Sequence, residues 1–270
     1  MQLDLNIINS LLETKVIGQS KSCPNEFHVS IDSTNNKAIE LAKLDDSNGV
    51  FVIAQEQTAG RGRQGRKFVS PSKQGLYMSL VLKVPNYLNL NLLTMALGVA
   101  VATMIEDKFN HQIELKWIND LIFKSKKLGG ILVELPYLDS DQFNIIIGIG
   151  INLYPFDYQK FDLNYPIEFM SNISQNFDLN FFVKDLLYYL EKFVYIDLLN
   201  NRLDNLVVDN WKKYNCTLGK DIRIIQGNNI SYGRAIDINE LGELVVESNG
   251  RVLNLNAGEV SMRRLNGHYL

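Results

Sequence analysis

The sequence is poor in cysteine and histidine, which limits the chemistry that it can carry. Its 270 residues include two cysteines and three histidines: Cys23, Cys216, His28, His111 and His268. The two cysteines lie too far apart in sequence for a metal-ligand spacing, and their low number favours a reducing cytosolic environment over a disulfide framework. Three scattered histidines also argue against a histidine-based zinc site.

The chain also lacks a strong excess of either charge and any long apolar run. Its formal net charge is −3, so no global field would recruit nucleic acid. No uninterrupted apolar run reaches the length of about 20 residues that spans a membrane. The N-terminal stretch MQLDLNIINSLLETK has no basic segment leading into an apolar core, as a signal peptide would have. We therefore expect a cytoplasmic protein without membrane association.

Several common motifs are missing as well. The segment GRGRQGR at 60–66 lacks the Gly-Lys-Ser/Thr ending of a P-loop. GIGIN at 148–152 precedes a proline-containing loop, whereas a dinucleotide fingerprint precedes a helix. Neither a protein-kinase motif set nor a Gly-x-Ser-x-Gly elbow is present. These absences exclude the most familiar nucleotide-binding and hydrolase classes.

The sequence does contain a dense basic segment, AGRGRQGRKFVSP, at 59–71. Arginine presents a fixed fork of donors to carboxylate or phosphate oxygens, and glycine lets a backbone approach a ligand closely. In a mildly acidic protein this local feature favours a small anionic ligand, although the segment alone is equally compatible with an exposed basic turn. Its cations and glycines are Arg61, Arg63, Arg66, Lys67, Gly60, Gly62 and Gly65.

Hydrophobic periodicity predicts a larger α+β unit over 1–216 and a small β unit over 217–270. Predicted strands of the first unit cover 27–31, 50–54, 75–84, 113–122, 128–135 and 143–153. Predicted helices are a short one within 1–26, one carrying Ala38 to Ala42, an amphipathic one over 90–109, and two over 181–199 and 203–214. Short alternating strands at 222–225, 231–238, 244–247 and 252–256 then predict an antiparallel barrel, with the domain boundary near Cys216.

Polar side chains gather where these predicted elements end. Ser33, Thr34 and Asn35 stand at a strand-to-helix junction, where they can cap the helix, contact a ligand, or do both. Lys116, Asn119 and Asp120 gather at the end of the predicted strand over 113–122. The lysine-rich sequence at 124–127 predicts a hairpin turn.

Glycines thin the two paired strands that follow this turn. They are Gly129, Gly130, Gly148 and Gly150. Glycine weakens a strand unless something must approach the backbone closely. The pattern suggests a flat small molecule lying against the sheet, and a pair of β-bulges is the alternative.

Together, these features suit the joining of a carboxylate to a nucleotide phosphate. The two anions repel each other as they approach, and arginine and lysine lower that barrier by binding their oxygens. A magnesium ion held partly by a carboxylate such as Asp120 would screen the leaving pyrophosphate.

Seven short segments, in this order, resemble the biotin protein ligase family (biotin–acetyl-CoA-carboxylase ligase). They lie within residues 27–153, and the C-terminal barrel extends the resemblance to most of the chain. Each segment alone is weak, whereas the set is highly specific. The segments are DSTN at 32–35, Gln57 followed by AGRGRQGR at 59–66, SP at 70–71, GLYMSL at 75–80, KWIND at 116–120, KLGGILVEL at 127–135 and GIGIN at 148–152.

This resemblance implies a fold and a two-step reaction. The fold is α+β, with a central, mostly antiparallel or mixed sheet flanked by helices, of the class II synthetase and biotin ligase type, and a small C-terminal SH3-like β-barrel. Biotin and ATP, with Mg²⁺, give biotinyl-5′-adenylate and pyrophosphate. A lysine of a biotin carboxyl carrier protein, a subunit of acetyl-CoA carboxylase, then attacks the mixed anhydride and releases AMP. The resemblance implies no tightly bound cofactor and is compatible with a monomer or a homodimer.

The family motifs also imply roles for individual residues. Arg63 and Lys127 are the implied catalytic residues, although Lys127 without the motif would be taken for a solvated turn lysine. Asp120 is the implied metal ligand. The implied biotin-binding residues are Ser33, Thr34, Asn35, Gln57, Arg61, Gly62, Arg63, Lys127, Gly129, Gly130, Gly148 and Gly150. The implied nucleotide-binding residues are Arg63, Arg66, Lys116, Asn119 and Asn152.

Some positions depart from the family pattern. The family usually has proline where Ile118 stands and often tryptophan where Phe68 stands. The aromatic residue near the adenine is not assigned, with Tyr165 and Phe169 as candidates. Family members that repress transcription carry an N-terminal winged helix, which residues 1–26 are too short to form. We therefore expect a ligase without sequence-specific DNA binding.

Two rival functions remain open at this point. A lipoate or octanoate ligase or transferase has a related fold, but the RGRQGR and KLGGIL segments argue against it. A biotin-sensing or scaffold protein would bind without catalysing, but it has no need of the set formed by Arg61, Arg63 and Lys127.

Overall fold

A seven-stranded mixed sheet forms the centre of the computed structural model, which describes residues 3–85, 88–136, 142–161, 163, 165–195, 205–257 and 261–264. The strand order is β1-β2-β3-β7-β6-β5-β4, with β1 and β2 parallel and all other pairs antiparallel. This confirms the predicted α+β fold with a mostly antiparallel sheet. The strands are β1 (Glu26–His28), β2 (Phe51–Ala54), β3 (Gly75–Pro85), β4 (Glu114–Lys116), β5 (Asp120–Phe123), β6 (Lys126–Glu134) and β7 (Gln142–Asn152).

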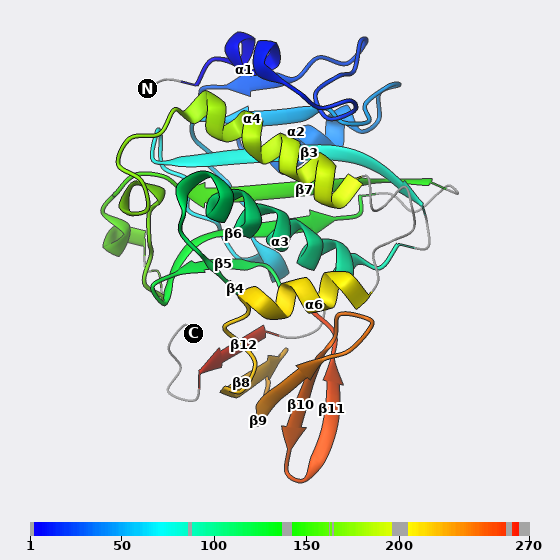
Figure 1. Cartoon of the computed structure of the whole chain (residues 1–270), viewed down its shortest axis with the longest axis vertical. Coiled ribbons are helices and arrows are strands. Elements are labelled where there is room, and N and C mark those ends of the chain that lie inside the picture. The colour runs from blue at the N-terminus through cyan, green and yellow to red at the C-terminus, as the bar shows by residue number, and fades with distance from the viewer. Residues whose placement is uncertain are drawn as a thin grey trace.

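Helices cover both faces of this sheet (Figure 1). Alternate residues of the central strands point to opposite faces. Val52 and Val81 therefore pack with α2, whereas Phe51 and Leu80 belong to the main core. The helices are α1 (Leu5–Leu11), α2 (Thr34–Leu41), α3 (Leu90–Phe109), α4 (Leu179–Leu190) with its π-helical extension (Glu191–Tyr195), and α6 (Asn205–Tyr214). Three short 3₁₀ turns lie at Arg63–Gly65, Tyr158–Phe161 and Met170–Asn172.

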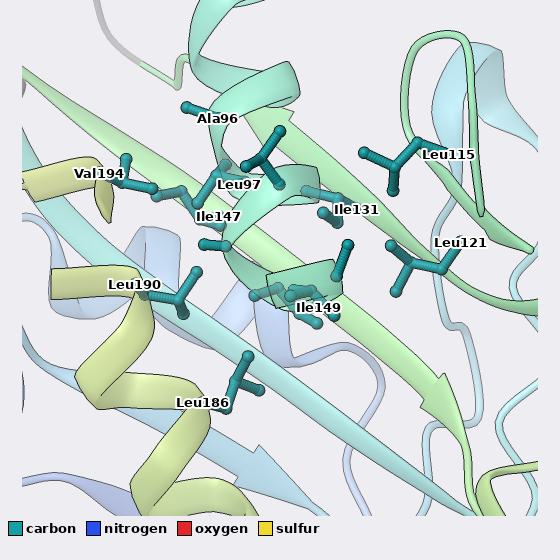
Figure 2. Close-up of a cluster of buried hydrophobic side chains, with 14 of the residues drawn as sticks. Ala96, Leu97, Leu115, Leu121, Ile131, Ile147, Ile149, Leu186, Leu190 and Val194 are labelled. Atoms are coloured by element: carbon teal, nitrogen blue, oxygen red, sulfur yellow. The ribbon is translucent and has the colours of Figure 1, made fainter. Parts of the chain in front are cut away.

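Helix α3 was predicted to be amphipathic, and this was wrong. Other elements cover the helix on more than one side. It packs between the sheet, α4 and α6, so apolar residues are needed around most of its surface. Figure 2 shows Leu97 of α3 near Leu190 and Val194 of the α4 segment and above Ile147 of β7. Within the described residues α3 passes a length and composition test for a membrane span, yet 72% of that window is buried inside the protein.

The predicted strand over 113–122 is in fact a hairpin, with β4 and β5 paired antiparallel. The chain reverses at Trp117 and Ile118, which are joined by a cis peptide bond. The backbone N–H of Trp117 donates to Thr217 Oγ1 at 2.9 Å, and its indole Nε1 donates to the carbonyl of Gly242 at 3.1 Å. These distant groups accept the two hydrogen bonds that Trp117 donates. The alternation of apolar and polar residues in the local sequence could not reveal them.

A second, five-stranded antiparallel sheet lies at the C-terminal end, below α6 in Figure 1. Its order is β11-β10-β9-β8-β12, which agrees with the small antiparallel unit predicted from the sequence. Strand β12 was not predicted, because its sequence SMRR lacks apolar alternation. The strands are β8 (Asp221–Gln226), β9 (Asn229–Ile238), β10 (Leu244–Ser248), β11 (Arg251–Leu255) and β12 (Ser261–Arg264).

Two adjacent glycines of β6 have different surroundings. The same substitution should therefore lower the free energy of unfolding by different amounts at the two positions. A Cβ atom on Gly129 would lie 2.3 Å from the carbonyl oxygen of Gly150 on β7, whereas one on Gly130 would lie 3.4 Å from its nearest neighbour. We expect Gly129→Ala to destabilise the protein by about 2 kcal/mol or more, because the clash is with backbone. Gly130→Ala should change stability by less than about 0.5 kcal/mol. Denaturant unfolding of both variants checks this, and equal costs would contradict it.

Candidate active site

A cavity of about 230 Å³ opens over strands β3, β6 and β7, between the start of α2 and the basic loop 59–67. Met78, Ile131 and Ile149 also border the cavity, although they are buried members of the main core. Most of the sequence-predicted site residues line the cavity, although they come from distant parts of the chain. Those residues are Ser33, Thr34, Asn35, Gln57, Arg61, Gly62, Arg63, Arg66, Asn119, Asp120, Lys127, Gly130, Gly148 and Gly150.

Three predicted site residues do not line the cavity. Lys116 is a buried residue of β4, with 2% of its surface exposed. Asn152 donates from Nδ2 to the backbone carbonyl of Lys127 at 3.1 Å, so it supports the turn that carries this lysine. Gly129 lies against the backbone of Gly150. The positions of all three favour supporting roles over direct contact with a ligand.

One end of the cavity is a buried polar pocket at the start of α2. Gln57 Oε1 accepts from the backbone N–H of Thr34 at 2.8 Å and from its hydroxyl at 3.0 Å, while Gln57 Nε2 donates to Ser70 Oγ at 2.9 Å. Ser33 occupies the N-cap position, but its side chain makes no capping hydrogen bond. The Ser33 hydroxyl therefore does not serve as a simple helix cap.

Asn35 is held from both ends of its amide. Its Oδ1 accepts from the hydroxyl of Ser79 at 2.5 Å, and its Nδ2 donates to Glu134 Oε2 at 2.6 Å. A Cβ atom on Gly148 would lie 2.3 Å from Asn35 Oδ1. The glycine at 148 is therefore needed to seat this amide of the protein itself, a cause that the sequence did not reveal.

The polar pocket is short of one donor hydrogen. Thr34 Oγ1 contacts Gln57 Oε1 at 3.0 Å and Ser79 Oγ at 2.7 Å, and Ser79 Oγ contacts Asn35 Oδ1 at 2.5 Å. Two hydroxyl hydrogens must serve these three oxygen–oxygen contacts, because both amide oxygens only accept. A ligand that presents N–H groups to this pocket would supply the missing donor.

The basic loop is a small hairpin folded over the cavity. Arg61 pairs with Lys67 through a β-bridge, and the N–H of Gly62 donates to the carbonyl of Arg66 at 2.7 Å. The tip turns at Gln64 and Gly65, whose φ angles of 55° and 70° lie in the left-handed region. The Arg66 guanidinium donates to Gln64 Oε1 at 2.9 Å. The tip is therefore held by contacts within the loop.

The two leading arginines of this loop reach different parts of the protein. Arg61 forms an ion pair with Glu134, near the end of β6. Arg63 donates to Asn119 Oδ1 at 3.1 Å and to the backbone carbonyl of Ala257, which follows β11 in the C-terminal sheet. Arg63 thus joins the loop, the β4–β5 turn and the second sheet at the cavity.

Lys127 faces into the cavity, unlike its neighbours in the turn. Its Nζ lies 2.6 Å from Asp120 Oδ1 and 5.2 Å from the ring centre of Tyr165, and 14% of its side chain is exposed. The side chain of Lys126 is 49% exposed. Lys124 and Ser125 form the turn with φ angles of 49° and 61°. A solvated turn lysine does not describe Lys127.

Asp120 was the predicted metal ligand, and the structure places it against Lys127. Within the described part of the chain no three His, Cys, Asp or Glu side chains gather into a metal-binding group. Mg²⁺ commonly takes one or two protein carboxylates together with substrate phosphates. Asp120 fits that pattern as a single carboxylate beside a phosphate-bound ion, but the described residues form no metal site of their own.

Burial and hydrogen bonding shift the pKa values of several ionisable groups. Burial raises the pKa of the Tyr77 hydroxyl, which donates to the carbonyl of Pro71 at 3.0 Å and so stays protonated. A hydrogen bond from Asn36 lowers the pKa of the Asp32 carboxyl. Burial raises the pKa of the Cys216 thiol to about 12, which leaves it unreactive at neutral pH.

Sequence reasoning missed several residues that shape the site. A Cβ atom on Gly150 would lie 2.5 Å from the ring of Phe68, so this glycine makes room for an aromatic side chain of the loop. Glu134, Ser79 and the carbonyl of Ala257 were not predicted at all. Of the two adenine-packing candidates, Tyr165 lines the cavity and Phe169 does not. Two quoted segments offered a signal, because Glu134 lies within KLGGILVEL and Ser79 lies within GLYMSL.

Comparison with known proteins places this geometry in a family. Residues 27–152 match the Biotin/lipoate A/B protein ligase family, and residues 217–263 match the Biotin protein ligase C terminal domain. The bifunctional ligase/repressor BirA of Bacillus subtilis is 30% identical over 254 residues, which cover 93% of this chain and 76% of that relative. The chain belongs to the biotin protein ligase family.

Other members of the biotin protein ligase family match along most of their length. The biotin–[acetyl-CoA-carboxylase] ligase of Mycobacterium tuberculosis is 28% identical over 228 residues, covering 80% of this chain and 79% of that protein. The biotin protein ligase of Aquifex aeolicus, solved with biotin and ATP, is 26% identical with a TM-score of 0.74, covering 89% of this chain and 99% of that one. This biotin protein ligase is therefore an ATP-dependent enzyme with the two-part fold of its relatives.

Proposed function

We propose that this ligase activates biotin with ATP and transfers it to a specific lysine of a biotin carboxyl carrier protein of acetyl-CoA carboxylase. The observation that carries the proposal is the cavity itself, where a donor-poor polar pocket and two cationic side chains, Arg61 and Lys127, face one space. A cyclic urea has two N–H groups and one carbonyl, which suits that pocket, and a carboxylate suits the cations.

In the proposed first step, a biotin carboxylate oxygen attacks the α-phosphorus of ATP. The new bond joins the carboxylate oxygen to the α-phosphorus, and pyrophosphate leaves with the electrons of the broken phosphorus–oxygen bond. Arg63 and Lys127 stabilise the charge that builds up on the phosphoryl oxygens, since both are donors already directed into the cavity. Mg²⁺ bound to the ATP phosphates would screen the pyrophosphate, with Asp120 as its nearest candidate ligand on the protein.

In the proposed second step, the amine of a carrier lysine attacks the carbonyl carbon of the mixed anhydride. A carbon–nitrogen bond forms, AMP leaves, and the amine loses its proton. The remaining proposed biotin contacts are Ser33, Thr34, Asn35, Gln57, Gly62, Gly130, Gly148 and Gly150, whereas Arg66, Lys116, Asn119 and Asn152 belong to the nucleotide side, with Lys116 and Asn152 in supporting positions.

Incubation of the pure protein with biotin, ATP, Mg²⁺ and a carrier domain tests this proposal. Mass spectrometry should show the carrier heavier by one biotinyl group, and a carrier whose target lysine is replaced by arginine should stay unmodified. Lipoate in place of biotin should give no product and no ATP–pyrophosphate exchange. Tight biotin binding without modification of the carrier would instead favour a sensor, and exchange with lipoate alone would favour a lipoate ligase.

We further propose that this ligase acts in the cytoplasm and does not repress transcription, unlike the Bacillus subtilis relative. The support is local. Helix α1 is seven residues long, and its Ile8 is buried in the main core, so it is unavailable for reading DNA. A gel-shift assay with biotin, ATP and candidate operator DNA should show no specific complex, and a specific shift would refute this part of the proposal.

A further inference from the structure

We propose that Glu134 is a displaceable counter-ion beside the site: it holds Arg61 until the carboxylate of the substrate takes its place. This inference rests on the proposed biotin-activating function and adds a positioning residue to it. Glu134 then sets how tightly the enzyme binds an anionic ligand compared with a neutral ligand of the same shape.

The first observation is the ion pair between Arg61 and Glu134. Their side chains are 36% and 29% exposed, so water screens the pair only in part. Arg61 lines the cavity and also a second hollow beside the loop, and Glu134 lines only the second one, so the guanidinium stands where an anion in the cavity could reach it. A ligand carboxylate at this position must therefore compete with the carboxylate that is already there.

The second observation is that the two partners are anchored very differently. Glu134 Oε2 also accepts from Asn35 Nδ2 at 2.6 Å, and Asn35 is itself fixed by Ser79 and 4% exposed. Glu134 is thus tied to the buried framework beneath the cavity. Arg61 stands on the glycine-rich loop, which is bridged to itself. When the pair separates, the arginine moves and the glutamate stays.

The third observation is that the pair leaves donors of Arg61 unused. The same oxygen atom, Glu134 Oε2, accepts from Arg61 and from Asn35, so the guanidinium is not held in a two-oxygen fork. Arg61 Nε is buried and has no hydrogen-bond partner among the described residues. A ligand carboxylate could accept from two guanidinium nitrogens at once, which is the stronger arrangement. The existing pair is therefore suited to exchange.

The proposal predicts that Glu134→Gln separates charged from neutral ligands. Calorimetry should show biotin binding about fivefold more tightly than in the wild type, a ratio that corresponds to about 1 kcal/mol. The Kd of biotinol, in which an alcohol replaces the carboxylate, should change by less than about twofold. Glu134→Ala also removes the charge and should shift the biotin-to-biotinol ratio of Kd values in the same direction.

Glu13→Gln is the matched control, because Glu13 pairs at 2.9 Å with Lys184 of α4 and not with an arginine of the basic loop. It should leave both Kd values unchanged. If Glu134 were only structural, acting through Asn35, its replacement would weaken both ligands by the same factor, and that result would overturn the proposal. Failure of the proposed function is distinguishable, because the wild type would then show no biotin-dependent ATP–pyrophosphate exchange, whatever Kd values the variants give.

Discussion

Replacing Lys127 with methionine is expected to slow adenylate formation by about 10²- to 10³-fold, the range seen when one preorganised donor to a transition-state oxyanion is removed. Biotin binding should weaken by less than about tenfold, because the polar pocket at Thr34 and Gln57 is left in place. Biotin-dependent ATP–pyrophosphate exchange measures the first quantity, and calorimetry measures the second. A normal exchange rate would contradict the assigned role.

The ion pair with Asp120 complicates this substitution and also supplies its control. Removing Lys127 takes away the ammonium group that lies 2.6 Å from the Asp120 carboxylate, so this carboxylate would repel an anionic ligand in the cavity more strongly. The double variant Lys127→Met/Asp120→Asn removes this repulsion and shows what the loss of the ammonium costs alone. Lys124→Met, in the same turn but outside the cavity lining, should leave the exchange rate unchanged.

Arg63→Ala is expected to release the biotinyl-adenylate about 10²-fold faster than the wild type. The guanidinium donates to Asn119 and to the carbonyl of Ala257, and each bond to a charged group contributes about 1.5 kcal/mol or more. Without them the loop is no longer held over the reactive anhydride. Rapid dialysis after a single turnover measures the release directly.

A conservative variant and a distant arginine make this result specific. Arg63→Lys keeps the charge but loses the fork that reaches two partners, so its release rate should lie between those of the wild type and Arg63→Ala. Arg251→Ala changes an exposed arginine of β11 and should not affect release. Retention of the intermediate by Arg63→Ala would refute the clamping role.

The sequence predicted much of this molecule because its strands and helices are locally consistent. The apolar runs at 75–84 and 143–153 predicted β3 and β7, and the helix over 90–109 matches α3 residue for residue. The family segments, taken in their order, predicted most of the residues that line the cavity. The hairpin at Trp117 escaped prediction because its stabilising partners, Thr217 and Gly242, lie about a hundred residues or more away.

The thinned strands show where local reasoning reaches its limit. Glycine at 148 and 150 correctly indicated a close approach to the sheet, but the nearest groups there are Asn35 and Phe68 of the protein itself. Gly129 also indicated a close approach, and the group that lies close to it is the backbone of the neighbouring strand β7. A glycine reveals that space is needed, whereas the group that fills it depends on tertiary structure.

The bond from Arg63 to the carbonyl of Ala257 connects the terminal sheet to the loop that lines the cavity. Because the acceptor belongs to the main chain, no point substitution at Ala257 other than one that moves the backbone can erase it. A chimera that takes this sheet from a relative would keep the hydrogen bond to Arg63 only if the carbonyl at position 257 occupies the same place relative to the loop. Substitutions in this sheet that leave the Ala257 carbonyl in place should therefore preserve the hydrogen bond to Arg63.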